Sequence, residues 1–232
     1  MATISVAEAA KRLGVSRQRV VAMIQSGSLP AVKVGRSYVI DAAAVSRHRG
    51  AVSRPLSPRM AAALLRLAAH EKPGVSASEV SRLRGRLARL HDAADPVGLV
   101  RGWLPGRARR LEMSAAAADL QTIAADPRLM LAGVSDPRAG MQSSRLVEGY
   151  VHEADAEGLF GEHFVVQAPS RSEANVIVHV ADPVPPLSPL LVAADLADYR
   201  EGREERQAAT VLNRWISDSD IIRPRPRATG GR

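Results

Sequence analysis

The chain is 232 residues long, with 46% hydrophobic residues and a formal net charge of +8 at pH 7, and this length predicts one or two domains with buried cores. It contains no cysteine, which excludes disulfide bonds, thiolate metal sites and a cysteine nucleophile. Because no apolar run approaches the roughly 18 residues of a membrane-spanning helix and no signal peptide is recognisable, we expect a cytoplasmic protein without membrane contact.

Residues 1–50 predict a small module of two helices, a β-hairpin and a third short helix. Ser5 is placed as the N-cap of the first helix, and Glu8 follows three residues later in the capping-box pattern. Ser16 is placed as the cap of the second helix, in which apolar residues recur at helical spacing. Asp41 is placed to cap the third helix. This order of elements is that of a winged helix-turn-helix.

The polar residues of this module predict a DNA-binding face. The start of the second helix of a helix-turn-helix meets base edges in the major groove, where arginine pairs with guanine and glutamine with adenine. The hairpin VKVGRSYVI has a basic tip, which suits contact with phosphates or the minor groove. The residues that we expect to contact DNA are Ser16, Arg17, Gln18, Arg19, Lys33, Arg36 and Tyr38.

A resemblance covers the same residues. The spacing A-E-A-A-K-R-L-G-V-S-R-x-x-V, followed by G-x-L-P-A-x-K-V-G-R-S-Y-x-I, resembles the excisionase and MerR-like winged helix-turn-helix family. It spans about a fifth of the chain and implies binding to double-stranded DNA. The alternative is a small helical domain whose arginines are only solvated.

The distribution of charge supports DNA binding by this module. Residues 1–58 contain nine Lys or Arg and two Asp or Glu, a net charge of +7, which would attract phosphates in a salt-sensitive way. Residues 128–232 contain twelve basic and fifteen acidic residues, a net charge of −3. The acidic part is therefore better suited to a protein partner than to a nucleic acid.

Residues 51–94 predict a linker followed by a helical connector. The segment GAVSRPLSPR has two prolines and no periodicity, which is typical of a linker. A helix is expected over residues 60–70, and Ser76 with Glu79 opens a second one that runs to about residue 94. Three arginines lie on its outer face: Arg82, Arg86 and Arg89. They are either solvated, or they make an auxiliary contact with phosphate or with a second copy of the protein in a dimer.

Residues 95–217 predict an α+β domain with a small mixed sheet. Strands are expected over residues 128–134, 147–152, 163–168 and 175–181, the last two joined as a hairpin. Helices are expected after Asp95 and over residues 115–125, 156–160, 187–199 and 203–215. Residues 218–232 form an Arg/Pro-rich tail that we expect to be mobile. The whole chain is thus expected to be an α+β protein.

Little in this domain points to catalysis. No lysine follows residue 72, which excludes P-loop and Schiff-base lysines there. His152, Glu153 and Asp155 cluster, but neighbours on a strand point to opposite faces and converge poorly on a metal. Asp195 and Asp198 share a helix face, and without a partner base we interpret them as solvated or in salt bridges. We expect no enzymatic activity, no metal and no cofactor.

A second resemblance spans about residues 95–215. The segments DPRLMLAGVSDPRAG, VEGYVHEADAEGLF, ANVIVHVADPVPP and PLLVAADLADYREGREERQAATVL resemble, in this order, the C-terminal domain of AbiEi-type antitoxins. This resemblance implies a type IV, abortive-infection toxin–antitoxin pair, in which the protein is the DNA-binding partner of a nucleotidyltransferase-like toxin. The chain departs from that family by its excisionase-like front module.

Together these features favour a non-enzymatic antitoxin and transcriptional autorepressor. It would bind inverted repeats in its own promoter, with two copies on the DNA, and counteract the toxin. One alternative is an excisionase-like factor or another sequence-specific regulator without a toxin partner, although excisionases are usually much shorter. Another is an enzyme acting on nucleic acid or a nucleotide, which the missing lysines and dispersed acids disfavour.

Overall fold

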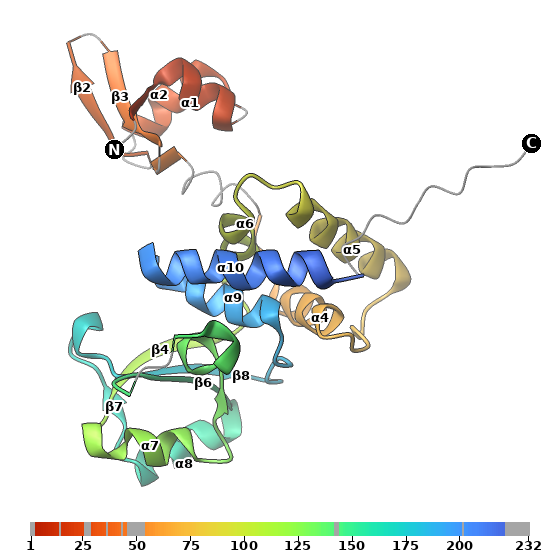
Figure 1. Cartoon of the computed structure of the whole chain (residues 1–232), viewed down its shortest axis with the longest axis vertical. Helices are drawn as coiled ribbons and strands as arrows, with labels where there is room; N and C mark the ends of the chain where they lie inside the picture. Colours follow the sequence, from red (N-terminus) through yellow and green to blue (C-terminus); the bar gives the residue numbers. More distant parts are fainter. Residues whose placement is uncertain are drawn as a thin grey trace, which may run out of the picture. The chain divides into compact units, whose positions relative to one another are not determined.

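The chain folds as two units, Met1–Arg54 and Pro55–Arg232 (Figure 1). This computed structural model describes residues 3–13, 15–25, 29–35, 37–42, 44–45, 54–141, 144–200 and 202–220. The expectations for Arg36 at the hairpin tip and for residues 221–232 of the tail lie outside these ranges. Helices and strands occur in both units, so the α+β class is confirmed, with a helix-turn-helix first and a small mixed sheet in the second unit.

The first unit combines two helices with a three-stranded antiparallel sheet. Helix α1 spans Val6–Leu13 and α2 spans Arg17–Gln25. The sheet has the order β1-β3-β2 and consists of β1 (Thr3–Ser5), β2 (Ala31–Val34) and β3 (Ser37–Asp41). Strands β2 and β3 form the predicted hairpin. The sequence pattern does not predict β1, whose three residues pair with β3 immediately before α1.

A single apolar cluster holds these elements together. It is built from Ala9, Ala10, Leu13, Val20, Met23, Leu29, Ile40, Ala44 and Val45. Of the third helix expected after Asp41, only part is described, and its residues Ala44 and Val45 are buried in this cluster. The helices and the hairpin therefore share one core, which fixes α2 relative to the hairpin.

Five helices of the second unit share another core. They are α4 (Pro58–Ala68), α5 (Ala77–His91), α6 (Pro96–Trp103), α9 (Pro189–Asp198) and α10 (Gly202–Asp218). The two helices that we expected to connect the domains, α4 and α5, bury Leu64, Leu65 and Leu87 in this core with Trp103 and Leu191. Helices α4 and α5 therefore pack into the same core as α6, α9 and α10.

A five-stranded mixed sheet forms the middle layer of the second unit (Figure 1). Its order is β5-β6-β8-β4-β7, for β4 (Arg109–Ser114), β5 (Met130–Leu131), β6 (Val147–His152), β7 (Val166–Gln167) and β8 (Val176–Ala181). Only the β6–β8 pair is parallel among the described strands. Helices α7 (Leu120–Ala124) and α8 (Glu153–Glu162) cover one face, and α9 with α10 lies on the other.

Short 3₁₀ turns complete the second unit. They occupy Ala117–Asp119, Gly133–Ser135, Pro137–Ala139 and Arg171–Glu173. The first of them takes the place of the first half of the helix expected over residues 115–125. The second ends the strand expected over residues 128–134 after only two residues. None of the helices in the described part of the chain has the length and apolar character needed to span a bilayer.

The predicted hairpin of residues 163–168 and 175–181 is wrong. Strands β7 and β8 both pair with β4, which lies between them. The sequence of β4, RRLEMS, has only two large apolar residues, so its pattern does not reveal a strand. Helix α8 also begins earlier than expected, because His152 rather than Asp155 is its N-cap and accepts a hydrogen bond from the Ala154 N–H at 3.2 Å.

Candidate nucleic-acid interface

The two helices of the first unit are held by caps at their starts. The Ser5 hydroxyl accepts a hydrogen bond from the Glu8 N–H at 3.2 Å, and the Ser16 hydroxyl accepts one from the Arg19 N–H at 3.2 Å. Both caps were predicted, and they satisfy backbone donors that have no partner within a helix. The Glu8 carboxylate accepts a hydrogen bond from Arg12 Nε at 3.0 Å, one turn further along α1. The caps therefore fix where α2 starts and which side chains begin it.

The first turn of α2 presents the predicted base-reading residues. Arg17, Gln18 and Arg19 are all exposed, whereas Val20 and Met23 bury the opposite side of the helix. In the parts of the chain that the structure describes, no hydrogen bond or ion pair engages the side chains of the two arginines or of Gln18. No acidic residue lies in this turn, so the guanidinium charges add to the positive end of the helix dipole. Such a surface attracts phosphates and leaves its donors free for base edges.

The hairpin contributes further residues that were predicted to contact DNA. Lys33 on β2 is exposed and stands directly opposite the half-buried Tyr38 on β3, so both side chains lie on the same face of the hairpin. Gly35 turns the chain with a φ of 60°, a left-handed conformation that glycine adopts without strain. The neighbouring Arg36, also predicted to contact DNA, is outside the described residues.

The second unit contains a buried polar cluster that the sequence did not predict. Asp195 is fully buried rather than solvated, and its Oδ1 accepts hydrogen bonds from Arg107 Nη2 at 2.7 Å and from the Tyr150 hydroxyl at 2.8 Å. Arg107 also binds Asp198 Oδ2 at 2.6 Å. Burial raises the pKa of Asp195, and the nearby positive charge of Arg107 opposes this rise. Of the two alternatives expected for these acids, a solvated face or salt bridges, both form salt bridges with Arg107, and Asp195 does so in the interior.

Next to this ion pair, Glu148 organises a second set of buried contacts. Its Oε1 lies 2.8 Å from His179 Nε2, and its Oε2 accepts hydrogen bonds from the Val134 N–H at 2.9 Å and the Tyr199 hydroxyl at 3.0 Å. Gly133 has a φ of 52°, and a Cβ atom there would lie 1.9 Å from Glu148 Oε2. Only glycine lets this carboxylate approach the backbone so closely.

The residues that carried the antitoxin resemblance thus have structural roles. The Ala-Gly-Val-Ser turn at 132–135 binds Glu148, and Tyr150 and Asp195 bind Arg107. The Asn175 side chain bonds the N–H and the carbonyl of Ala115, which follows β4. Each of these groups is held by neighbouring protein atoms. Among the described residues, no group of three or more His, Asp or Glu side chains is placed to hold a metal ion.

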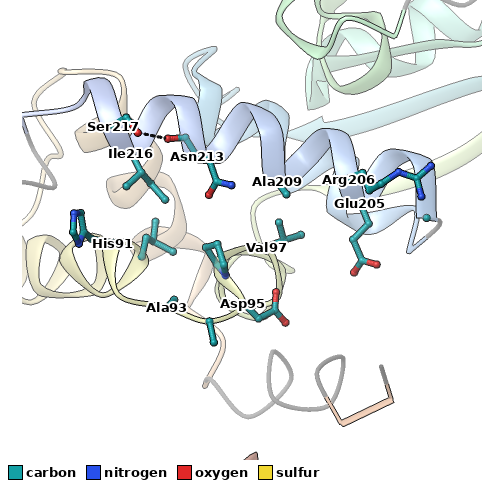
Figure 2. A pocket seen from close by; sticks show the side chains of 14 residues that line it. His91, Ala93, Asp95, Val97, Glu205, Arg206, Ala209, Asn213, Ile216 and Ser217 are labelled. Atoms are coloured by element: carbon teal, nitrogen blue, oxygen red, sulfur yellow. Dashed lines mark hydrogen bonds between the residues drawn. The ribbon is translucent and has the colours of Figure 1, made fainter. Parts of the chain in front are cut away.

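A groove of about 870 Å³ lies on the surface of the second unit, between α10 and the segment that joins α5 to α6 (Figure 2). Its floor includes Leu90, Val97 and Ile216. Two acids at its edge are engaged already: Asp95 caps α6 through the Gly98 N–H at 2.8 Å, and Glu205 binds Arg101 at 2.8 Å. Both carboxylates that line the groove are therefore engaged in contacts within the second unit.

Comparison with known proteins bears on the first unit. The family described as "Helix-turn-helix domain" matches residues 3–49. No curated protein and no solved structure matches the chain. The matched residues include the capped α1 and α2 and the hairpin with the exposed Lys33. The first unit therefore has the elements of a helix-turn-helix domain, and the match supports DNA binding by this unit.

Proposed function

We propose that the protein is a sequence-specific transcriptional regulator and the antitoxin of a type IV toxin–antitoxin pair. In this proposal the first unit binds inverted repeats in the protein's own promoter, and the second counteracts a nucleotidyltransferase-like toxin. The observation that carries it is the exposed Arg17-Gln18-Arg19 turn at the start of α2, whose side-chain donors have no partner within the described residues. Those donors can pair with guanine and adenine in the major groove.

The proposed antitoxin role rests on the second unit. The residues that resemble AbiEi-type antitoxins are the ones that hold its interior together, including Gly133, Tyr150 and Asp195. Because these shared residues maintain the fold, we expect the second unit to have the fold of the antitoxin domain that it resembles. The net charge of −3 over residues 128–232 also disfavours phosphates as the main partner and favours a protein.

We further propose that the second unit has no catalytic activity of its own. Catalytic acids need a free carboxyl group facing a substrate. Here Asp195 binds Arg107, Glu148 binds His179 and Tyr199, and both acids are buried. Their arrangement supports the scaffold role.

Two measurements separate the parts of this proposal. Fluorescence anisotropy with the upstream promoter and with a shuffled duplex tests DNA recognition, and we expect tighter binding to the promoter at equal salt. Co-expression with the neighbouring gene tests the antitoxin role, and we expect the neighbour's product to be toxic alone and harmless together with this protein. Promoter binding without relief of toxicity would favour the alternative, a regulator or excisionase-like factor that has no toxin partner.

A further inference from the structure

The second unit contains a recess of about 570 Å³. It lies where α4 meets the loop before α5 and the adjoining ends of β4 and β8. Small side chains, among them Ala62, Ala63 and Ala108, leave the space open. Its volume lies within the range of about 300–1,000 Å³ that small-molecule sites occupy.

Two arginines that line this recess are unpaired within the described part of the chain. Within residues 54–141, 144–200 and 202–220, no hydrogen bond or ion pair engages the guanidinium group of Arg66 or of Arg109, and both line the recess. Arg66 Nη1 lies 3.6 Å from the position that a Cβ would take at Gly74, in the loop that forms one wall. Arg109 is exposed at the start of β4. One arginine thus comes from a helix and the other from the sheet.

The other charged residues of the recess are already paired. Arg59 binds Glu79, and this hydrogen bond lowers the pKa of Glu79 to about 2, so the pair stays ionised and neutral overall. The Arg107 guanidinium is turned inward and is neutralised by Asp195 and Asp198. Asp182, the one acid that lines the recess as described, lies 3.0 Å from His152 Nε2. Because His152 Nδ1 accepts a hydrogen bond from the Ala154 N–H, the imidazole is neutral and Asp182 keeps its negative charge. Arg66 and Arg109 are the two guanidinium groups of the recess that remain unpaired within the described residues.

We propose that this recess binds the phosphate group of a phosphorylated small molecule of about mononucleotide size, with Arg66 and Arg109 as its ligands. Guanidinium groups match the geometry of phosphate oxygens and bind them through paired hydrogen bonds. Two unpaired guanidinium groups can donate several hydrogen bonds to a phosphate monoester, which has three acceptor oxygens and is close to a dianion at neutral pH. A recess also admits the terminal phosphate of a small molecule more readily than a phosphate within a duplex. This site is separate from the proposed DNA-reading turn.

The test is isothermal titration calorimetry on the full chain with AMP as the probe, and with adenosine and succinate as comparison ligands. We expect one AMP per chain, no binding of adenosine, and weaker binding of succinate. Arg66→Gln and Arg109→Gln should each weaken AMP binding by about tenfold or more, because each removes a charged hydrogen-bond donor. Arg82→Gln, on the exposed face of α5 outside the recess, should leave the affinity unchanged.

Several results would overturn this assignment. Absence of AMP binding at millimolar concentration would do so, as would AMP binding that persists in the Arg66→Gln, Arg109→Gln double variant. Succinate binding as tight as AMP would show a general anion site, and binding of inorganic phosphate without AMP would show that no organic phosphate fits. Binding only of a single-stranded oligonucleotide, sensitive to Arg66→Gln, would assign the recess to a nucleic-acid backbone. Unchanged circular dichroism of the variants ensures that lost binding is not lost folding.

Discussion

Replacing Arg107 by methionine should destabilise the second unit strongly. Methionine keeps much of the side chain's length and apolar contact but removes the charge that neutralises Asp195. Arg107 is 8% exposed and Asp195 is 0% exposed. The arginine donates to Asp195 at 2.7 and 3.0 Å, to Asp198 at 2.6 Å and to the Leu104 carbonyl at 3.0 Å. Removing one partner of such a buried ion pair costs about 3–5 kcal/mol, because the other charge is left without compensation.

The loss should depend on pH in a defined direction. Burial already raises the pKa of Asp195, and the loss of Arg107 removes the charge that opposes this rise. In the variant, folded Asp195 therefore binds a proton that unfolded Asp195 releases above a pH of about 4. The stability of the variant then falls as the pH rises from about 4 toward the raised pKa of folded Asp195. The loss of stability relative to the parent chain should therefore be smaller at pH 5 than at pH 8.

The assay is urea unfolding followed by tryptophan fluorescence. The chain has two tryptophans, Trp103 and Trp215, and both are buried in the second unit, so the signal reports that unit. Arg82→Met, on the exposed face of α5, is the matched control and should change stability by less than about 0.5 kcal/mol. A deficit for Arg107→Met below about 1 kcal/mol, or one that does not change with pH, would refute the view that this ion pair is essential to the fold.

Further predictions follow from the same structure. Gly133→Ala should cost about 3 kcal/mol or more of stability, because its Cβ would overlap Glu148. The Cβ of Gly85→Ala in α5 would meet no atom within 4 Å, so this variant should be more stable by about 0.5–1 kcal/mol. Urea unfolding measures both, and equal effects would contradict this reasoning. Arg17→Ala should weaken binding to the preferred duplex by about 1–3 kcal/mol and lessen its preference over random DNA, and equal loss on both duplexes would argue against base contact. Lys33→Ala should weaken binding to all duplexes similarly and lower the salt slope by about one, as measured by anisotropy at several salt concentrations.

Local patterns predicted the elements whose cause is local. The capping residues Ser16 and Ser76 start α2 and α5, as expected, and Asp95 starts α6. Helices α9 and α10 also lie close to their predicted ranges. In the described part of the first unit, local patterns predicted α1, α2 and the hairpin but not β1, which forms by pairing with β3.

Contacts between distant residues could not be predicted in this way. Arg107 and Asp195 are 88 positions apart, and no spacing rule links them. One signal was present: Asp195 occurs within the apolar run LLVAADLA, and Glu148 and His179 occur within strands that are otherwise apolar. Polar residues inside apolar elements indicate buried partners, because an unpartnered buried charge is costly. Strand β4, which lies between β8 and β7, was missed because most of its residues are polar and find their partners only in the fold. The Arg110 guanidinium, for example, binds Glu112 and lies 5.3 Å from the Tyr199 ring centroid.

The candidate DNA-contacting residues were predicted from their place in the helix-turn-helix, and the structure adds that those it describes on α2 are exposed and lack partners within the described chain. The base sequence that they prefer depends on contacts that only a complex contains. Titration of the full chain against its upstream promoter and a shuffled duplex, over a range of salt concentrations, therefore tests the central claim most directly. We predict tighter binding to the promoter at every salt concentration and a loss of that preference in the Arg17→Ala, Arg19→Ala double variant. Equal affinity of the parent chain for both duplexes, even at low salt, would contradict the claim.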